Sequence, residues 1–198
     1  MYRFSIFAAL VTFVMVTVTG CLSPPPRLYL LEPVVDEKSQ RTPTEVQRIG
    51  LPVITLPEYA DTQSIPTRVD SGRVVLSQHH QWAESPDVAI TRVLANRIEA
   101  YTGGTALVEP WPRGFETQAR IEYDLLKLLR DETGGVEVAG QMRLISGDGD
   151  DVIAIESFQF FRESVESESD DFFYTLSLII NDIARLTIVE LQAMEVPN

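Results

Sequence analysis

Cys21 is the residue whose type and surroundings point most clearly to chemistry. It follows Val18-Thr19-Gly20, small residues of the kind that a signal peptidase accepts before its cleavage site. The motif resembles the bacterial lipobox, with Val18 where Leu is commoner and Thr19 where Ala or Ser is commoner. A lipobox thiol is the nucleophile that takes up a diacylglycerol group. The sequence therefore predicts lipidation of Cys21.

The first 20 residues have the pattern of a signal peptide. Arg3 gives a positive start, and residues 4–18 are almost wholly apolar, shorter than the about 20 residues of a spanning helix. Alternatively, Cys21 ends an ordinary membrane anchor. Against this, it is the only cysteine, and the following Pro24-Pro25-Pro26 cannot continue a helix. We expect three parts: a signal peptide (1–20), a lipidated cysteine with a proline-rich tether (21–27), and a single globular domain (28–198).

The residues after the cysteine indicate which membrane holds it. In proteobacterial lipoproteins an Asp directly after the cysteine favours retention in the inner membrane, whereas Leu22 and Ser23 stand here. Several acyl chains on one cysteine bind a membrane durably. We therefore expect a lipid-anchored protein on the periplasmic face of the bacterial outer membrane.

Few other residues offer catalytic or metal chemistry. His79 and His80 are the only histidines, and neighbours on an extended segment point to opposite sides, so they should not share a metal ion. Asp148, Asp150 and Asp151 faintly resemble a calcium loop, but the EF-hand spacing is missing and a solvated hairpin turn is simpler. The sequence also lacks a GxSxG elbow, a phosphate loop and a dinucleotide fingerprint. We expect no catalytic residue, no metal, no cofactor and no enzyme activity.

Composition and charge exclude further classes of protein. Apolar residues make up 44% of the 198 residues, which is enough for a core and excludes wholesale disorder. Lys and Arg number 16 against 29 acidic residues, giving a formal net charge of −13. This balance repels phosphate backbones and disfavours electrostatic adhesion to anionic lipid. We expect no nucleic-acid partner, and an acidic surface that stays in solvent or meets a basic protein.

Short strands and two helices must position any functional residues. A helix is expected from Pro86, after the N-cap candidate Ser85, to Gly103-Gly104, and a second helix from about Asp170. Apolar runs and period-two alternation predict strands over 27–31, 49–56, 73–76, 106–108, 119–129, 136–144 and 152–161, the last three as an antiparallel meander. The expected fold class is α/β (α+β-like), a mixed and mostly antiparallel sheet of about six strands with two main helices packed on it.

The last helix and the acidic run before it each allow two interpretations. The wide apolar face from Phe172 to Leu191 fits a core helix on the sheet, and the alternative is a helix that also meets a partner subunit. Asn181, Asp182 and Arg185 interrupt the apolar run and argue against a membrane span. The acidic run is most simply a solvated loop, or else a docking site for a basic partner; it comprises Glu163, Glu166, Glu168, Asp170 and Asp171.

One stretch, residues 56–84, carries more information than the rest. It begins Leu56-Pro57-Glu58-Tyr59-Ala60-Asp61, continues through Ile65 and Arg68, and ends His80-Gln81-Trp82-Ala83-Glu84 before the first helix. Tyr59 and Trp82 can bury their rings while a polar edge stays wet, and Arg68 can pair with a carboxylate. A packed loop corner would also account for these residues. Tyr59, Arg68 and Trp82 are therefore our candidates for a structural or partner-contact corner.

The order of these residues resembles the PqiC-like family of ABC-type transport auxiliary lipoproteins. Members have a strand, a segment like LPEYLDR, an Ile and an Arg, and then a WAE segment that enters a helix. The resemblance spans residues 28 to about 190 and is specific over 56–84. Ala60 stands where Leu is usual and Thr62 where Arg is usual, and these are the two departures from the family pattern.

The resemblance implies a non-enzymatic role in the cell envelope. Such lipoproteins accompany MCE-domain proteins, which form rings or tubes for lipid passage between the membranes. This lipoprotein would be the outer-membrane component that docks the MCE protein, and a homo-oligomer is compatible with that role. The alternatives are a lipoprotein of outer-membrane assembly or cell-wall binding without a transport role, and an envelope hydrolase.

Overall fold

The part of the chain that the structure describes forms eight strands and two helices. The computed structural model describes residues 24–34, 41–70, 72–164 and 170–194, so Cys21 lies outside the described residues. The helices are α2 (Pro86–Thr102) and α3 (Asp170–Ala193). The strands are β1 (Arg27–Tyr29), β2 (Arg48–Leu51), β3 (Ser64–Val69), β4 (Arg73–Trp82), β5 (Thr105–Val108), β6 (Ala119–Arg130), β7 (Val136–Ser146) and β8 (Val152–Arg162).

The long strand β6 organises the sheet. On one side it pairs antiparallel with β7, which pairs antiparallel with β8. On its other side three consecutive parts of the chain run parallel to it: β2 at its start, Thr55 opposite Asp124 in the middle, and β3 at Arg130. Strand β5 then extends β2, while β4 and β1 extend β3. The sheet therefore has different outer strands at its two ends. Strands β2 and β5 lie beside the start of β6, and strands β3, β4 and β1 lie beside its end.

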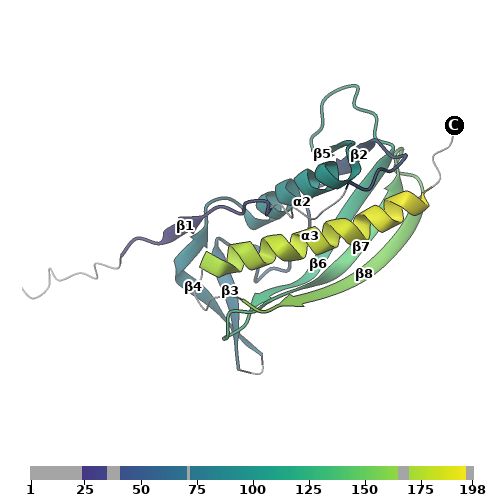
Figure 1. Cartoon of the computed structure of the whole chain (residues 1–198). Helices are drawn as coiled ribbons and strands as arrows, with labels where there is room; N and C mark the ends of the chain where they lie inside the picture. The colour runs from purple at the N-terminus through teal and green to yellow at the C-terminus, as the bar shows by residue number, and fades with distance from the viewer. Residues whose placement is uncertain (1–23, 35–40, 71, 165–169, 195–198) are drawn as a thin grey trace, which may run out of the picture.

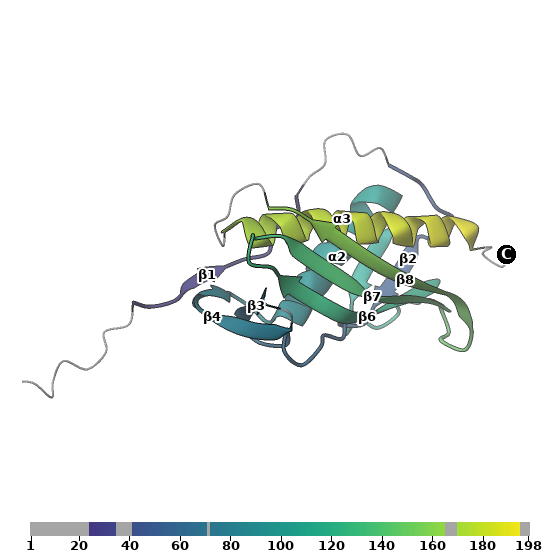
Figure 2. The ribbon, with the colours of Figure 1, turned by 90° about the horizontal axis from the view of Figure 1, so that it is seen from below.

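Both helices lie on one face of this sheet, side by side (Figure 1). Figure 2 shows the same two-layer arrangement from below, with the helices covering one face and the other face open. The alternation along β6 explains the layers, because Ile121, Tyr123 and Leu125 are buried while Glu122 and Asp124 between them are half-buried. The core fills the space between the helices and this inner face.

Local signals set the ends of α2 as the sequence predicts. Pro86 occupies the first turn after Ser85, whose backbone has the extended conformation of an N-cap residue. The Ser85 hydroxyl, however, donates to the Asp87 carboxylate at 2.5 Å rather than capping the helix. Gly103 ends the helix with φ 76°, a left-handed conformation that glycine adopts without a steric cost.

The α/β fold class is confirmed, with eight strands among the described residues where about six are expected. The sequence does not predict strand β3, because Pro66 interrupts it and its residues form no apolar run. Strand β4 runs on to Trp82, well past Leu76, and so places His79 and His80 on a strand. Strand β2 stops at Leu51, because Pro52 removes a backbone donor, and only Thr55 rejoins the ladder.

Helix α3 is long and apolar enough to cross a membrane by length and composition alone. In the structure, 67% of its most apolar window is buried inside the protein, against β7, β8 and α2. Phe172, Leu176 and Ile179 are almost completely buried. Helix α3 is therefore the core helix on the sheet that its apolar face predicts.

Candidate functional site

The three corner residues lie at the β1, β3 and β4 end of the sheet, but they do not form one cluster. Tyr59 lies in the turn after Pro57, where its hydroxyl accepts a hydrogen bond from the Leu128 backbone N–H at 3.3 Å. This contact fixes the 57–61 turn against strand β6. The turn itself is held by N–H groups of Ala60 and Asp61, which both donate to the Pro57 carbonyl.

Arg68 lies on the open face of the sheet and pairs with a carboxylate, as the sequence predicts. Its Nη1 is 3.2 Å from Glu137 Oε2 on β7. Glu137 also accepts hydrogen bonds from Lys127 Nζ at 2.9 Å and from Gln159 Nε2 at 2.8 Å. One carboxylate thus joins β3, β6, β7 and β8 across the open face.

The contacts of Glu137 also affect its pKa. Burial disfavours the ionised form of Glu137, but the hydrogen bonds from Lys127 and Gln159 and the charges of Lys127 and Arg68 outweigh it. The pKa of Glu137 therefore lies below its ordinary value of 4.5. Sequence reasoning missed Glu137, because nothing local distinguishes it from the many other carboxylates of this acidic chain.

Trp82 faces the opposite layer and belongs to the core. The residue is 1% exposed, and its ring packs edge-to-face against Phe173 at 4.9 Å and Phe172 at 6.0 Å between ring centroids. The expectation of a wet polar edge is not met: the indole Nε1 is buried and has no hydrogen-bond partner in the described part of the chain. Trp82 therefore joins β4 to the start of α3, away from the Arg68–Glu137 pair.

The two histidines take different positions. His80 Nδ1 lies 3.0 Å from the Tyr29 hydroxyl, and the two rings stack with centroids 5.6 Å apart. His79 is exposed on β4. Among the described residues no group of three or more His, Cys, Asp or Glu side chains is close enough to hold a metal ion.

The acidic turn between β7 and β8 is a hairpin turn held by its own hydrogen bonds. Asp148 accepts from the Ser146 hydroxyl at 2.5 Å and from the Asp150 backbone N–H at 3.2 Å. The bond from Ser146 is the main reason why the pKa of Asp148 lies below its ordinary value. Of the longer acidic run before α3, Glu166 and Glu168 lie outside the described residues.

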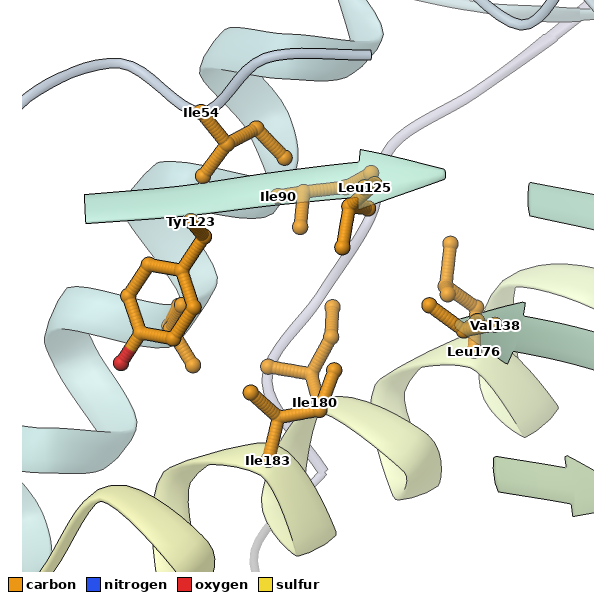
Figure 3. Close-up of a pocket in the computed structure, with 9 residues that line it drawn as sticks. Ile54, Ile90, Tyr123, Leu125, Val138, Leu176, Ile180 and Ile183 are labelled. Atoms are coloured by element: carbon orange, nitrogen blue, oxygen red, sulfur yellow. The ribbon is translucent and has the colours of Figure 1, made fainter. Parts of the chain in front are cut away.

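A small apolar cavity lies between the helices and the inner face of the sheet (Figure 3). Its volume is about 10 Å³, which is room for about one water molecule. The one polar group in its lining, the Tyr123 hydroxyl, is hydrogen-bonded to Thr187 Oγ1 at 2.7 Å. This cavity is a packing defect rather than a ligand site. The lining consists of Ile54, Ile90, Leu94, Tyr123, Leu125, Val138, Leu176, Ile180 and Ile183.

A larger, half-open pocket of about 200 Å³ lies beside the β3–β4 hairpin. Ile65 and Val75 supply apolar surface, and Arg130 from the end of β6 brings a positive charge. This pocket is smaller than the roughly 300–1,000 Å³ of typical ligand sites.

Comparison with solved structures shows the same fold in other proteins. The crystal structure of an uncharacterized protein superposes with a TM-score of 0.69 at 14% identity, covering 85% of this chain and 99% of that chain. The crystal structure of protein XCC0632 from Xanthomonas campestris has a TM-score of 0.68 at 14% identity, covering 84% and 98%. The PelC dodecamer from Paraburkholderia phytofirmans is more distant, with a TM-score of 0.47 at 12% identity, covering 79% and 97%.

Sequence comparison identifies the family. A search of curated proteins finds no matching relative. The model of the ABC-type transport auxiliary lipoprotein component matches residues 29–185, which include every strand and helix from β2 to β8 and most of α3. This confirms the resemblance seen in residues 56–84 and indicates a membrane-anchored, periplasmic component of a transport system. The chain belongs to the family of ABC-type transport auxiliary lipoproteins.

Proposed function

We propose that this protein is an outer-membrane lipoprotein that docks the MCE-domain protein of an intermembrane lipid transport system. The observation that carries the proposal is the family match over residues 29–185, because an auxiliary component acts on the other parts of its transporter. Acyl chains on Cys21 hold the protein at the periplasmic face. The protein works by binding and catalyses no reaction.

The frame of the domain supports a docking role. Strands β6, β7 and β8 form two long antiparallel ladders, and α3 covers their inner face. Glu137 ties four strands together on the open face. Such a frame presents a surface of fixed shape, which lowers the entropy cost of binding a large partner.

A pull-down tests the partner. The lipidated protein, tagged after Asn198, is captured from a detergent extract of the native envelope, and an MCE-domain protein should co-purify. The matched control is Cys21→Ser, which removes the acyl acceptor and leaves the domain unchanged. In detergent it should capture the same partner. Recovery of peptidoglycan or outer-membrane assembly factors alone would overturn the docking role and favour the non-transport alternative.

Mass spectrometry and membrane fractionation test the anchor separately. The mature protein should begin at an acylated Cys21 and sediment with the outer membrane in a density gradient, whereas Cys21→Ser should leave the outer-membrane fraction. An unmodified N-terminus at another residue would overturn the anchor. Sedimentation with the inner membrane would overturn its assignment to the outer membrane.

A further inference from the structure

Two leucines directly after the tether are held out into solvent. Leu28 is 61% exposed and Leu30 is 55% exposed. Tyr29 between them points the other way, into the domain, where its ring stacks on Phe173 with centroids 5.3 Å apart. Successive side chains of an extended chain point to opposite sides, so the inward Tyr29 forces both leucines outward.

The leucines cannot turn inward, because their backbone is fixed. Strand β1 pairs parallel with β4, matching Tyr29 with Trp82. The Tyr29 carbonyl accepts a hydrogen bond from the Ala83 N–H at 2.8 Å. The exposed apolar surface of Leu28 and Leu30 is therefore built into a rigid edge of the sheet.

The tether limits how far this edge can be from the membrane. Leu28 is seven residues after Cys21, and an extended chain spans at most roughly 3.3–3.6 Å per residue, so the two Cα atoms are at most about 25 Å apart. A lipidated Cys21 sits at the membrane surface, where the polar layer of one leaflet is about 5–8 Å thick. No other part of the described domain is kept so close to the membrane by the chain itself.

We propose that Leu28 and Leu30 insert into the interfacial layer of the membrane that holds the Cys21 lipid, so that the domain rests on its β1 end. The inference rests on the lipid anchor of the proposed function. The contact is apolar: Arg27 and Glu32, exposed on either side of the leucines, carry opposite charges. The contact should therefore form on zwitterionic lipid and resist salt.

A fluorescent label at each end of the domain tests the orientation. Cys21 is the only cysteine and its thiol is used in lipidation, so Leu28→Cys supplies the one free thiol. Val189→Cys is the matched control: Val189 is 59% exposed and belongs to the last turns of α3. The C-terminal end of α3 lies away from β1 (Figure 1). Sixteen residues of helix from Phe173, which touches Tyr29, to Val189 span about 24 Å.

The acylated variants are reconstituted in phosphatidylcholine vesicles and labelled with an environment-sensitive dye. The label at position 28 should shift to the blue, and lipids with a nitroxide near the headgroup should quench it several-fold more than the label at 189. The shift should persist in 0.5 M salt. Equal quenching at the two positions, or equal access of both labels to aqueous iodide, would overturn the contact.

The outcome is separate from that of the partner experiment. Failure to capture an MCE-domain protein would leave the membrane contact standing, and equal quenching would leave the docking role standing. If Cys21 proves to carry no lipid, the contact is refuted together with the anchor, because the tether then no longer brings β1 to the membrane.

Discussion

Replacing Glu137 by Gln should destabilise the protein at neutral pH. The Glu137 side chain is 12% exposed, while its partners Arg68 and Lys127 are 39% and 35% exposed, so solvent screens both ion pairs. Each such pair contributes about 0.5 kcal/mol, and the solvent-exposed hydrogen bond from Gln159 contributes about 1 kcal/mol. Because a Gln retains part of this bonding, we expect a loss of about 1–2 kcal/mol, or about 2–8 °C in melting temperature.

The same substitution should lose its effect in acid. The pKa of Glu137 in the folded protein is below its ordinary value of 4.5. A depressed carboxyl pKa contributes stability that is fully present above the unfolded pKa and is lost as the pH falls through the folded pKa. Gln takes up no proton in this range. The difference in melting temperature between the unsubstituted protein and Glu137→Gln should therefore be constant above about pH 5. It should shrink as the pH falls below 4.5.

Thermal melts of the acylated protein in detergent, followed by circular dichroism between pH 3 and 8, measure both effects. The control is Glu116→Gln, which makes the same charge change at an exposed position whose side chain forms no hydrogen bond or ion pair within the described residues. It should shift the midpoint by less than a degree. If the difference in melting temperature for Glu137→Gln is as large at pH 3 as at pH 7, the electrostatic reasoning is refuted. The absence of any difference at pH 7 would refute it too.

Substitutions at three further residues probe the core and the sheet. Trp82→Ala should cost about 3–5 kcal/mol in chemical denaturation, and Trp82→Phe clearly less, because its ring still meets Phe172 and Phe173; equal costs would contradict the aromatic packing. Gly140→Ala should cost at least about 1–3 kcal/mol, since its Cβ would lie 2.4 Å from the Asp124 carbonyl oxygen, which cannot move aside. An unchanged denaturation midpoint would refute that clash. Tyr123→Phe should cost only about 0.5–1.5 kcal/mol, because Thr187 keeps its bond to the Ile183 carbonyl. A loss of more than 3 kcal/mol in the free energy of unfolding would contradict the view that the hydroxyl contributes only one hydrogen bond.

Elements with local signals are predictable from the sequence. Pro86 and Gly103 mark both ends of α2, because each residue has a backbone preference that needs no tertiary contact. Within the meander, alternation predicts β6 and β7, since one face of each is buried, and the density of β-branched and aromatic residues predicts β8. Strand β3 has neither signal: it contains Pro66, and it forms through pairing with β4 and with the far end of β6.

The corner shows where prediction from sequence ends. Arg68 needs a carboxylate, but its partner Glu137 is 69 residues away and faces it through the register of β3, β6 and β7. That register depends on packing over the whole sheet, which no local pattern encodes. The burial of Trp82 likewise depends on where α3 begins, at Asp170, 88 residues further on.

The resting position on β1 also bears on the role of the corner. Arg68 and Trp82 lie on β3 and β4, at the same end of the domain as β1 (Figure 1). The opposite end carries the β5–β6 connection and the β7–β8 turn, which Thr117 joins by donating to the Gly147 carbonyl at 2.8 Å. If the domain rests on β1 as we propose, a partner that spans the periplasm would approach from that opposite end. Together with the burial of Trp82, this favours a structural role for the corner and directs the search for the docking surface to the distal loops.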